Sequence, residues 1–161
     1  MKFWLPEQSE GAIVALDTIE AAPVVDGLAH WRRLKGDLRY PAFDDRALEL
    51  LTPNTILVRA LDDDYEYASV GHALVEGFNV DFSGQRLSAI IAVLPKFGLG
   101  LKMLYDMVRE GGAPIGYRGW AGRDMSGAQF SYYESAVLPL GRQAVDHILV
   151  YSALVPKDAA A

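Results

Sequence analysis

Hydrophobic positions in the first part of the chain recur with a helical spacing. Leu28, Trp31 and Leu34 lie three residues apart, which places them on one side of a helix. Asp26 can cap the start of this helix, and Gly36 can end it. The sequence therefore predicts a short amphipathic helix near the N-terminus.

The pattern then changes from helical to strand-like. Residues 45–51 predict one more short helix, which the Thr-Pro-Asn sequence after it would stop. Residues 56–58 and 65–71 are rich in β-branched and aromatic side chains, and the acidic run 62–64 between them is typical of a turn. We expect an antiparallel hairpin of two strands.

The middle of the chain returns to a helical pattern. Residues 72–78 predict a short helix, and the clearest helical spacing follows Pro95 and continues to the Gly-Gly pair at 111–112. The hydrophobic face of this second segment is formed by Phe97, Leu101, Leu104, Tyr105 and Val108. We expect the longest helix of the chain here.

Three strand-like segments complete the pattern, over residues 114–122, 128–138 and 145–155. Glycine-containing turns separate them, which favours three consecutive antiparallel strands. Together with the hairpin and the helices before it, this order predicts an α+β fold: a five-stranded antiparallel sheet with helices on one face.

The length of 161 residues fits a single domain. We assign that domain to residues 26–156. Residues 1–25 have no clear hydrophobic period, so their structure is left open. Residues 157–161 end in alanines and are expected to form a frayed tail.

Composition and charge exclude several classes of function. The net charge of -6 argues against a nucleic-acid partner, because such binding needs clustered Lys and Arg. The absence of Cys excludes disulfides, thiolate metal sites and cysteine-linked flavin chemistry. No stretch of about 18 apolar residues suggests a membrane segment, so we expect a cytoplasmic location and no membrane partner.

Several short motifs carry a family resemblance over residues 26–155. They are Trp31-Arg32-Arg33-Leu34, Tyr67-Ala68-Ser69-Val70-Gly71, Gly84-Gln85-Arg86-Leu87, Tyr133 to Leu140 and Val145 to Leu149. In this order they resemble the PAS domain superfamily, and in particular a family of short bacterial PAS-like proteins with no attached output domain. The sequence departs from that family at Asn79, where a Gly is expected, and in residues 40–45, which lack an Arg before the acidic residues.

The resemblance implies a PAS fold with a sensory or regulatory role. PAS domains that bind haem generally use a His near the long helix, and residues 96–109 contain none. We therefore expect no haem and no cysteine-linked flavin, and an unidentified small ligand in their place.

Candidate catalytic and metal-binding residues are few. His30, His72 and His147 do not have the close spacing that places two metal ligands on one helix face. The glycine-rich segment 98–102 lacks the order of a phosphate-binding loop, and the acidic run 62–64 is interpreted as a solvated turn. We expect neither catalytic residues nor a metal site.

Side chains in a strand alternate between the two faces of a sheet, and turn length decides which residues share a face. A five-residue turn at 123–127 sets Arg118 opposite Tyr132, and a similar count sets Glu134 beside Tyr151. One face is then apolar, and the other mixes aromatic with charged residues. A change of one residue in turn length would exchange the two faces.

The apolar face and the longest helix predict where a ligand cavity would lie. Methionine adapts to irregular pockets, and tyrosine hydroxyls can orient a ligand. The predicted ligand-binding residues are Leu104, Met107, Tyr117, Tyr133 and Val150. The alternative is that these side chains simply fill the core.

The mixed face has the composition of a protein interface, or of a surface that the N-terminal helix covers. The predicted interface residues are Trp31, Arg118, Trp120, Phe130, Tyr132, Glu134 and Tyr151. Self-association through this face would make a homodimer.

These observations favour a non-enzymatic sensor that binds a small, apolar ligand and signals through a protein partner such as a kinase or regulator. The first alternative is an interaction adaptor with a core filled by its own side chains. The second is an enzyme or carrier with the cone-shaped α+β fold of the ketosteroid-isomerase type, which would use a pocket Tyr with an Asp or Glu.

Overall fold

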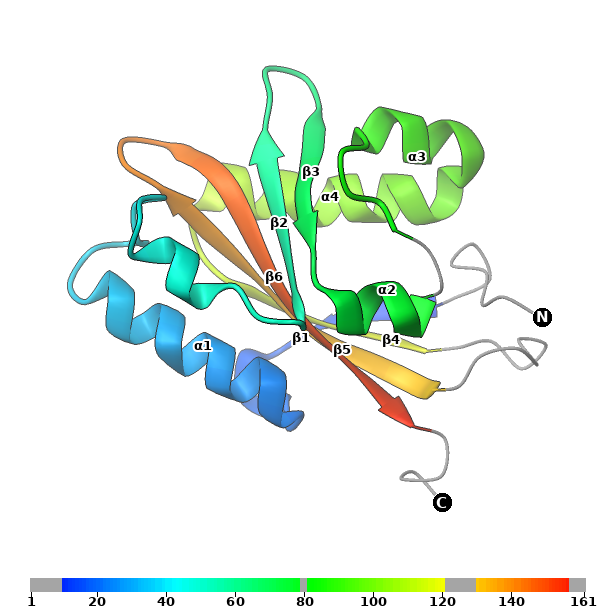
Figure 1. The fold of residues 1–161 in the computed structure, drawn as a ribbon, viewed down its shortest axis with the longest axis horizontal. Coiled ribbons are helices and arrows are strands. Elements are labelled where there is room, and N and C mark those ends of the chain that lie inside the picture. Colours follow the sequence, from blue (N-terminus) through cyan, green and yellow to red (C-terminus); the bar gives the residue numbers. More distant parts are fainter. Residues whose placement is uncertain (1–9, 79–80, 121–129, 157–161) are drawn as a thin grey trace.

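The structure is a computed structural model, and it describes residues 10–78, 81–120 and 130–156 (Figure 1). Asn79, the turn expected at 123–127 and the tail expected at 157–161 lie outside these ranges. The side chains of Trp120, Phe130 and Tyr132 are also outside the described part, although their backbone belongs to strands.

The described residues form one antiparallel sheet of six strands, in the order β1-β4-β5-β6-β2-β3. The strands are β1 (Glu10–Val14), β2 (Thr55–Ala60), β3 (Tyr65–Val70), β4 (Ile115–Trp120), β5 (Phe130–Gly141) and β6 (Val145–Pro156). The α-helices are α1 (Ala22–Lys35), α2 (His72–Phe78), α3 (Leu87–Val93) and α4 (Pro95–Gly111). Two short 3-10 helices, η2 (Leu16–Thr18) and η3 (Ala47–Leu50), lie on either side of α1 in the sequence.

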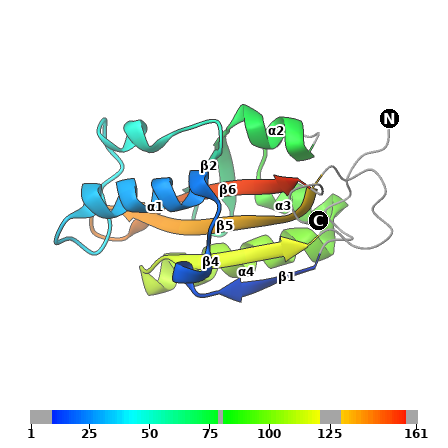
Figure 2. The ribbon, with the colours of Figure 1, turned by 90° about the horizontal axis from the view of Figure 1, so that it is seen from below.

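One feature of the predicted architecture needs correction. The sheet has six strands, not five, because the unassigned N-terminal segment supplies β1, which pairs with β4. Helices α3 and α4 pack on one face of the sheet, and α1 packs on the opposite face, on the side chains of Leu138, Leu149 and Tyr151. Figure 1 shows α4 behind the strands, and Figure 2 shows the sheet and helices from below.

Helix α1 begins earlier than its expected cap at Asp26. Pro23 lies in its first turn, where a fixed φ and a missing N–H favour a helix start. At its end, Gly36 has a positive φ of 53°, as the glycine at this position predicted. The buried side of α1 carries Val24 and Leu28.

The short helix expected at 45–51 is the 3-10 helix η3. Just before it, the Asp44 Oδ1 accepts hydrogen bonds from the backbone N–H groups of Arg46 and Ala47 at 3.0 and 3.2 Å. The Tyr151 hydroxyl donates to the carbonyl of Leu50 at 2.6 Å, which ties η3 to β6.

The longest α-helix is α4, as its hydrophobic spacing predicted. Leu104, Tyr105 and Val108 are buried on its inner side, and Gly112 ends it in the left-handed conformation with φ 63°. Helix α3 crosses it at Gly98, where a Cβ atom would come within 2.7 Å of the Ile91 side chain.

The strand register differs from the expected one by two residues. Arg118 lies opposite Glu134, not Tyr132, and Glu134 lies opposite Ala153, not Tyr151. Between β4 and β5 the strand ends are separated by residues 121–129, not only by the assumed 123–127. Between β5 and β6 the shift comes from an irregular register near Gly141. Because side chains alternate with a period of two, a shift of two leaves Arg118 and Glu134 on one face and Tyr117 and Tyr133 on the other, as they were assigned.

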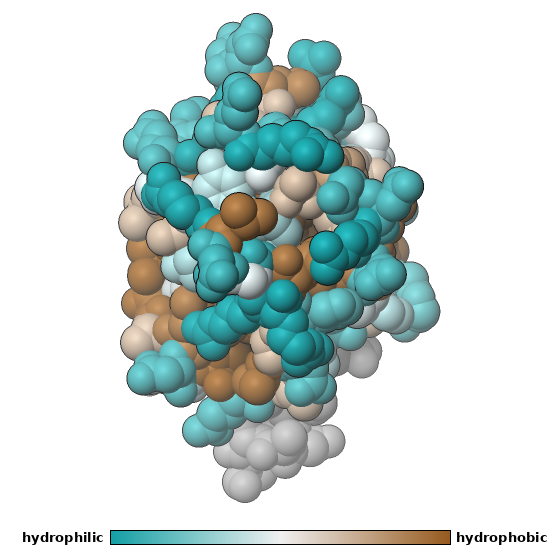
Figure 3. Space-filling view, turned by 90° about the vertical axis from the view of Figure 1, so that its left-hand side faces the viewer, coloured by the Kyte–Doolittle hydropathy of each residue, from teal (hydrophilic) through white to brown (hydrophobic). Residues whose placement is uncertain are grey.

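The surface is mostly polar at the end of the molecule where α1 ends. Hydrophilic side chains cover much of this end, with smaller hydrophobic areas between them (Figure 3).

Among the helices of the described residues, none combines the length and the hydropathy needed to cross a membrane.

The close packing of α1 on the sheet can be tested at Gly27. A Cβ atom there would overlap the ring of Tyr151, which is itself fully buried. We expect Gly27→Ala to lower the free energy of unfolding by about 1–3 kcal/mol, because the buried ring cannot move freely aside. Urea unfolding followed by tryptophan fluorescence measures this change.

Gly111→Ala is the matched control, since a Cβ atom at position 111 meets nothing within 4 Å. It should leave stability unchanged or raise it slightly, because alanine favours a helix more than glycine does. An equal loss of stability in both variants would contradict a specific contact between α1 and Tyr151.

Candidate ligand-binding cavity

A cavity of about 510 Å³ lies between α4 and the face of the sheet that α4 covers. This volume is within the range of small-molecule binding sites, which is about 300–1,000 Å³. Its apolar wall is formed by Ile56, Val70, Leu74, Phe82, Phe97, Leu101, Leu104, Val137 and Val150. The polar groups that reach it come from Tyr67, Lys96, Tyr105, Tyr117, Tyr133, Ser135 and Ser152.

The alternation of β5 and β6 explains why the space is not filled. Ser135 and Ser152 lie directly opposite each other in the two strands, and both line the cavity. Gly100 of α4 contributes no side chain to the opposite wall. Small residues on both the sheet and the helix therefore leave a volume that larger residues would occupy.

One polar group of the cavity is a pair of buried tyrosines. The hydroxyls of Tyr67, in β3, and Tyr105, in α4, lie 2.8 Å apart and share a hydrogen bond. Burial raises the pKa of both hydroxyls above the ordinary value, so both are neutral at physiological pH.

A second polar group is the serine pair at the centre of the sheet. The hydroxyls of Ser135 and Ser152 lie 2.9 Å apart, and both residues are buried. Like the tyrosines, they bring uncharged hydrogen-bonding groups to an otherwise apolar wall.

Tyr117 and Tyr133 form a third group, and glycines determine where their rings lie. The ring centroids are 6.1 Å apart. A Cβ atom at Gly119 would overlap the ring of Tyr133, and one at Gly11 would overlap that of Tyr117. The two glycines, which face each other across β1 and β4, thus allow both rings to lie flat along the sheet.

Four of the five predicted ligand-binding residues line the cavity: Leu104, Tyr117, Tyr133 and Val150. The exception is Met107, which is 43% exposed on the outer side of α4. Leu104 and Val108 face the core, whereas Met107 continues a four-residue spacing that starts at Leu99 on the outside of the helix.

The tyrosine and serine pairs were not among the predicted site residues. A signal for the serines existed, because Ser135 alternates with Tyr133 and Val137 on the same face of one strand. Tyr67 and Tyr105 meet only because β3 and α4 pack together, and no local pattern indicates that contact.

Among the predicted interface residues whose side chains are described, Trp31 belongs to α1, and Glu134 and Tyr151 lie on the sheet face that α1 covers. Trp31, Glu134 and Tyr151 are buried, and the indole Nε1 of Trp31 donates to the carbonyl of Pro139 at 3.1 Å. A partner could therefore reach these side chains only if α1 moved away. Arg118 is partly buried, with 25% of its side chain exposed.

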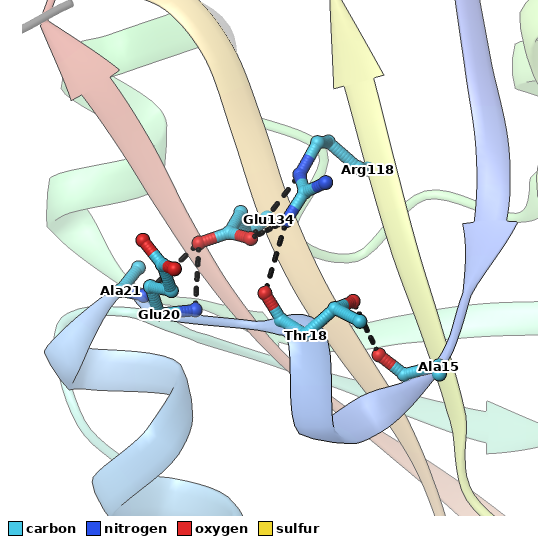
Figure 4. A network of polar contacts seen from close by, with 6 residues as sticks. All are labelled: Ala15, Thr18, Glu20, Ala21, Arg118 and Glu134. Carbon is cyan, nitrogen blue, oxygen red and sulfur yellow. Dashed lines mark hydrogen bonds and ion pairs between the residues drawn. The ribbon is translucent and has the colours of Figure 1, made fainter.

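Glu134 is the centre of a buried polar network (Figure 4). Its Oε2 pairs with the Arg118 guanidinium, at 2.5 Å from Nη2, and its Oε1 accepts from the backbone N–H groups of Glu20 and Ala21 at 3.1 and 3.0 Å. Arg118 Nη2 also donates to the carbonyl of Thr18 at 3.2 Å.

This network completes the start of α1. The helix has no side-chain cap of its own and no acidic residue in its first turn. Glu134 of β5 supplies the negative charge that the positive end of the helix dipole favours. Burial tends to raise the pKa of Glu134, but the hydrogen bonds from Arg118 and from the two N–H groups outweigh it and hold the pKa below its ordinary value.

No family model, curated protein or solved structure matches this chain. The chemistry of the cavity is therefore the basis for any function assigned to it.

Within the described residues, no three His, Asp or Glu side chains come together as a metal site would require.

The acidic run 62–64 has a structural role at one position. Asp64 accepts hydrogen bonds from the backbone N–H of Tyr65 at 2.8 Å and from the Ser88 hydroxyl at 2.5 Å, which links the hairpin to α3.

Replacing Glu134 tests the buried network. We expect Glu134→Gln to lower the free energy of unfolding at pH 7 by about 1–3 kcal/mol, because charge-assisted hydrogen bonds to Arg118 and α1 are weakened. The pKa of Glu134 is lower in the folded chain, so its contribution is present above the ordinary value of 4.5 and is lost as the pH falls through the folded value. The difference between the two proteins should therefore shrink in urea titrations below about pH 4.5.

Glu66→Gln provides the control, since Glu66 pairs with Arg59 at 2.9 Å on the surface. Such pairs contribute about 0–1 kcal/mol. A constant difference between Glu134→Gln and the unmodified chain down to pH 3 would show that the Glu134 charge is not what stabilises the network.

Proposed function

We propose that this chain is a PAS-like sensor domain, which binds a small, largely apolar molecule in the cavity and reports it through protein contacts. The observation that carries this proposal is the cavity of about 510 Å³ between α4 and the sheet. A core filled by its own side chains, as in a pure interaction adaptor, would leave no such volume.

The residues around the cavity favour binding over catalysis. Among the described residues that line it, Lys96 is the single charged side chain, and none is Asp, Glu or His. A general acid or base of the isomerase type would need a carboxylate within reach of the ligand. We therefore propose a non-enzymatic role.

The arrangement of elements supports a likeness to PAS domains. The hairpin β2–β3 is followed by three helices and then by β4, β5 and β6, which is the order on which the resemblance rests. These five strands lie side by side in the sheet. Relative to these five strands, β1 is an additional strand at the edge of the sheet, and α1 is an additional helix on one of its faces.

Helix α4 is suited to pass on a binding event, because it has a different role on each side. Its inner side lines the cavity with Leu101 and Leu104. Its outer side exposes a stripe of Leu99, Met103 and Met107, at 55%, 52% and 43%. A ligand that shifts the helix therefore also shifts an exposed apolar surface.

We further propose that a second copy of the chain binds this stripe. Leu99 and Met107 lie four residues before and after Met103, and all three are exposed. In an antiparallel pair of α4 helices with a two-fold axis at Met103, each Leu99 would meet Met107 of the second copy. A stripe that is apolar on both sides of its centre thus suits a symmetric homodimer.

The binding of a small molecule can be tested by native mass spectrometry of the purified chain. We expect a stoichiometric small molecule to be retained and then released on denaturation. Leu101→Trp should abolish its retention, because Leu101 is only partly buried and a larger ring there would project into the cavity. Leu38→Trp, at a position 63% exposed and outside the cavity, should retain the molecule.

Equal retention by both tryptophan variants would place the molecule somewhere other than this cavity. A chain that releases nothing, and that binds no probe of the kind described below, would argue against the sensor function altogether.

The homodimer is tested by sedimentation velocity with Met103→Glu. We expect the unmodified chain to sediment as a dimer and Met103→Glu as a folded monomer, because a carboxylate at the two-fold axis faces its own copy and loses apolar contact. Leu48→Glu introduces the same charge at a site that is 49% exposed in η3, and it should leave the dimer intact. An unmodified chain that stays monomeric at high concentration would refute the α4 interface.

A further inference from the structure

Tyr67 and Tyr105, two of the tyrosines that line the cavity, have one more hydrogen-bond donor than they can use between them. Each hydroxyl carries one proton, and the bond of 2.8 Å between Tyr67 and Tyr105 uses one of the two. Neither hydroxyl has another hydrogen bond within the described residues. One buried O–H therefore remains for a molecule inside the cavity.

The serine pair repeats this arrangement. Ser135 donates to Ser152 at 2.9 Å, which leaves the Ser152 proton without an acceptor among the described residues. Ser152 and Ser135 are 3% and 5% exposed, so bulk solvent has little access to either hydroxyl. Two separate parts of an apolar wall thus each present a surplus donor.

A surplus donor in an apolar site favours a ligand with an acceptor. A buried hydroxyl without a partner costs about 1–3 kcal/mol, and a ligand that accepts its proton removes that cost. A ligand group that can only donate would leave the surplus in place. Water can accept the same proton in the empty cavity, and an acceptor on the ligand would replace it.

The charges near the cavity point the same way. The described lining residues include no carboxylate, so a buried ammonium group would find no counter-ion among them.

We infer that the ligand is an apolar molecule that bears a carbonyl or carboxylate oxygen, and that this oxygen accepts a hydrogen bond from the Tyr67–Tyr105 pair. This inference rests on the proposed function, because it specifies the chemistry of a molecule bound in the same cavity.

Isothermal titration calorimetry with matched nine-carbon probes tests this inference. The probes are 2-nonanone, nonanoate and nonylamine, which share an apolar chain and differ in the terminal group. We expect 2-nonanone or nonanoate to bind at least about tenfold more tightly than nonylamine, as the loss of one hydrogen bond implies. Tighter binding of nonanoate would indicate an anionic ligand, and tighter binding of 2-nonanone a neutral one.

Deletion of both hydroxyls tests the donor. The double variant Tyr67→Phe/Tyr105→Phe should weaken the binding of the preferred probe about tenfold, because no O–H remains in the pair. Each single variant keeps one O–H that can still donate to the ligand, and so it controls for the change of side chain. Tyr65→Phe is the matched control, since the Tyr65 hydroxyl donates to Asp106 at 2.6 Å and does not line the cavity. It should leave the affinity unchanged.

The results of these titrations distinguish a failure of this inference from a failure of the proposed function. Equal affinity for all three probes, abolished by Leu101→Trp, would keep the cavity as a binding site but overturn the preference for an acceptor. An affinity for 2-nonanone and nonanoate that is unchanged in Tyr67→Phe/Tyr105→Phe would overturn the role of the tyrosine pair. If no probe binds and the chain retains no small molecule, the proposed function fails as well.

Discussion

The buried charge of Glu134 determines how α1 joins the sheet. A carboxylate whose side chain is 1% exposed is stable only when it is fully paired, and its partners here come from two segments. Arg118 belongs to β4, whereas the N–H groups of Glu20 and Ala21 lie directly before α1. The pairing of one side chain therefore fixes the position of α1 on the sheet, together with the segment that leads to it from β1.

The two faces of the sheet consequently differ in their packing. On the α1 side, Trp31 and Tyr151 fill the space and end in hydrogen bonds to backbone carbonyls. On the α4 side, Ser135 and Ser152 occupy central positions where larger side chains would close the core. Large side chains thus pack the α1 side of the sheet closely, whereas the α4 side encloses the cavity of about 510 Å³.

Local patterns in the sequence were sufficient for the order of the elements and for much of the cavity. The hairpin, the longest helix and the last three strands follow from spacing and turn residues. The alternation of side chains in β4 and β5 placed Tyr117 and Tyr133 on the correct face, even though the predicted register differed by two residues. Features that depend on contacts between distant segments were missed. The pairing of β1 with β4 connects the first part of the chain to its last part, and no local spacing indicates such a contact.

Those same distant contacts have a consequence for how the chain reaches its folded state. Glu20 and Glu134 are separated by 114 positions in the sequence, and the paired strands β1 and β4 are separated by a similar number. During synthesis the hairpin and α4 can form as soon as they emerge, but β1 and α1 have no sheet to join until the last strands are made. Loop closure over such separations is slow, so docking of the N-terminal segment is expected late in folding, and until then the hydrophobic side of α1 is available to chaperones.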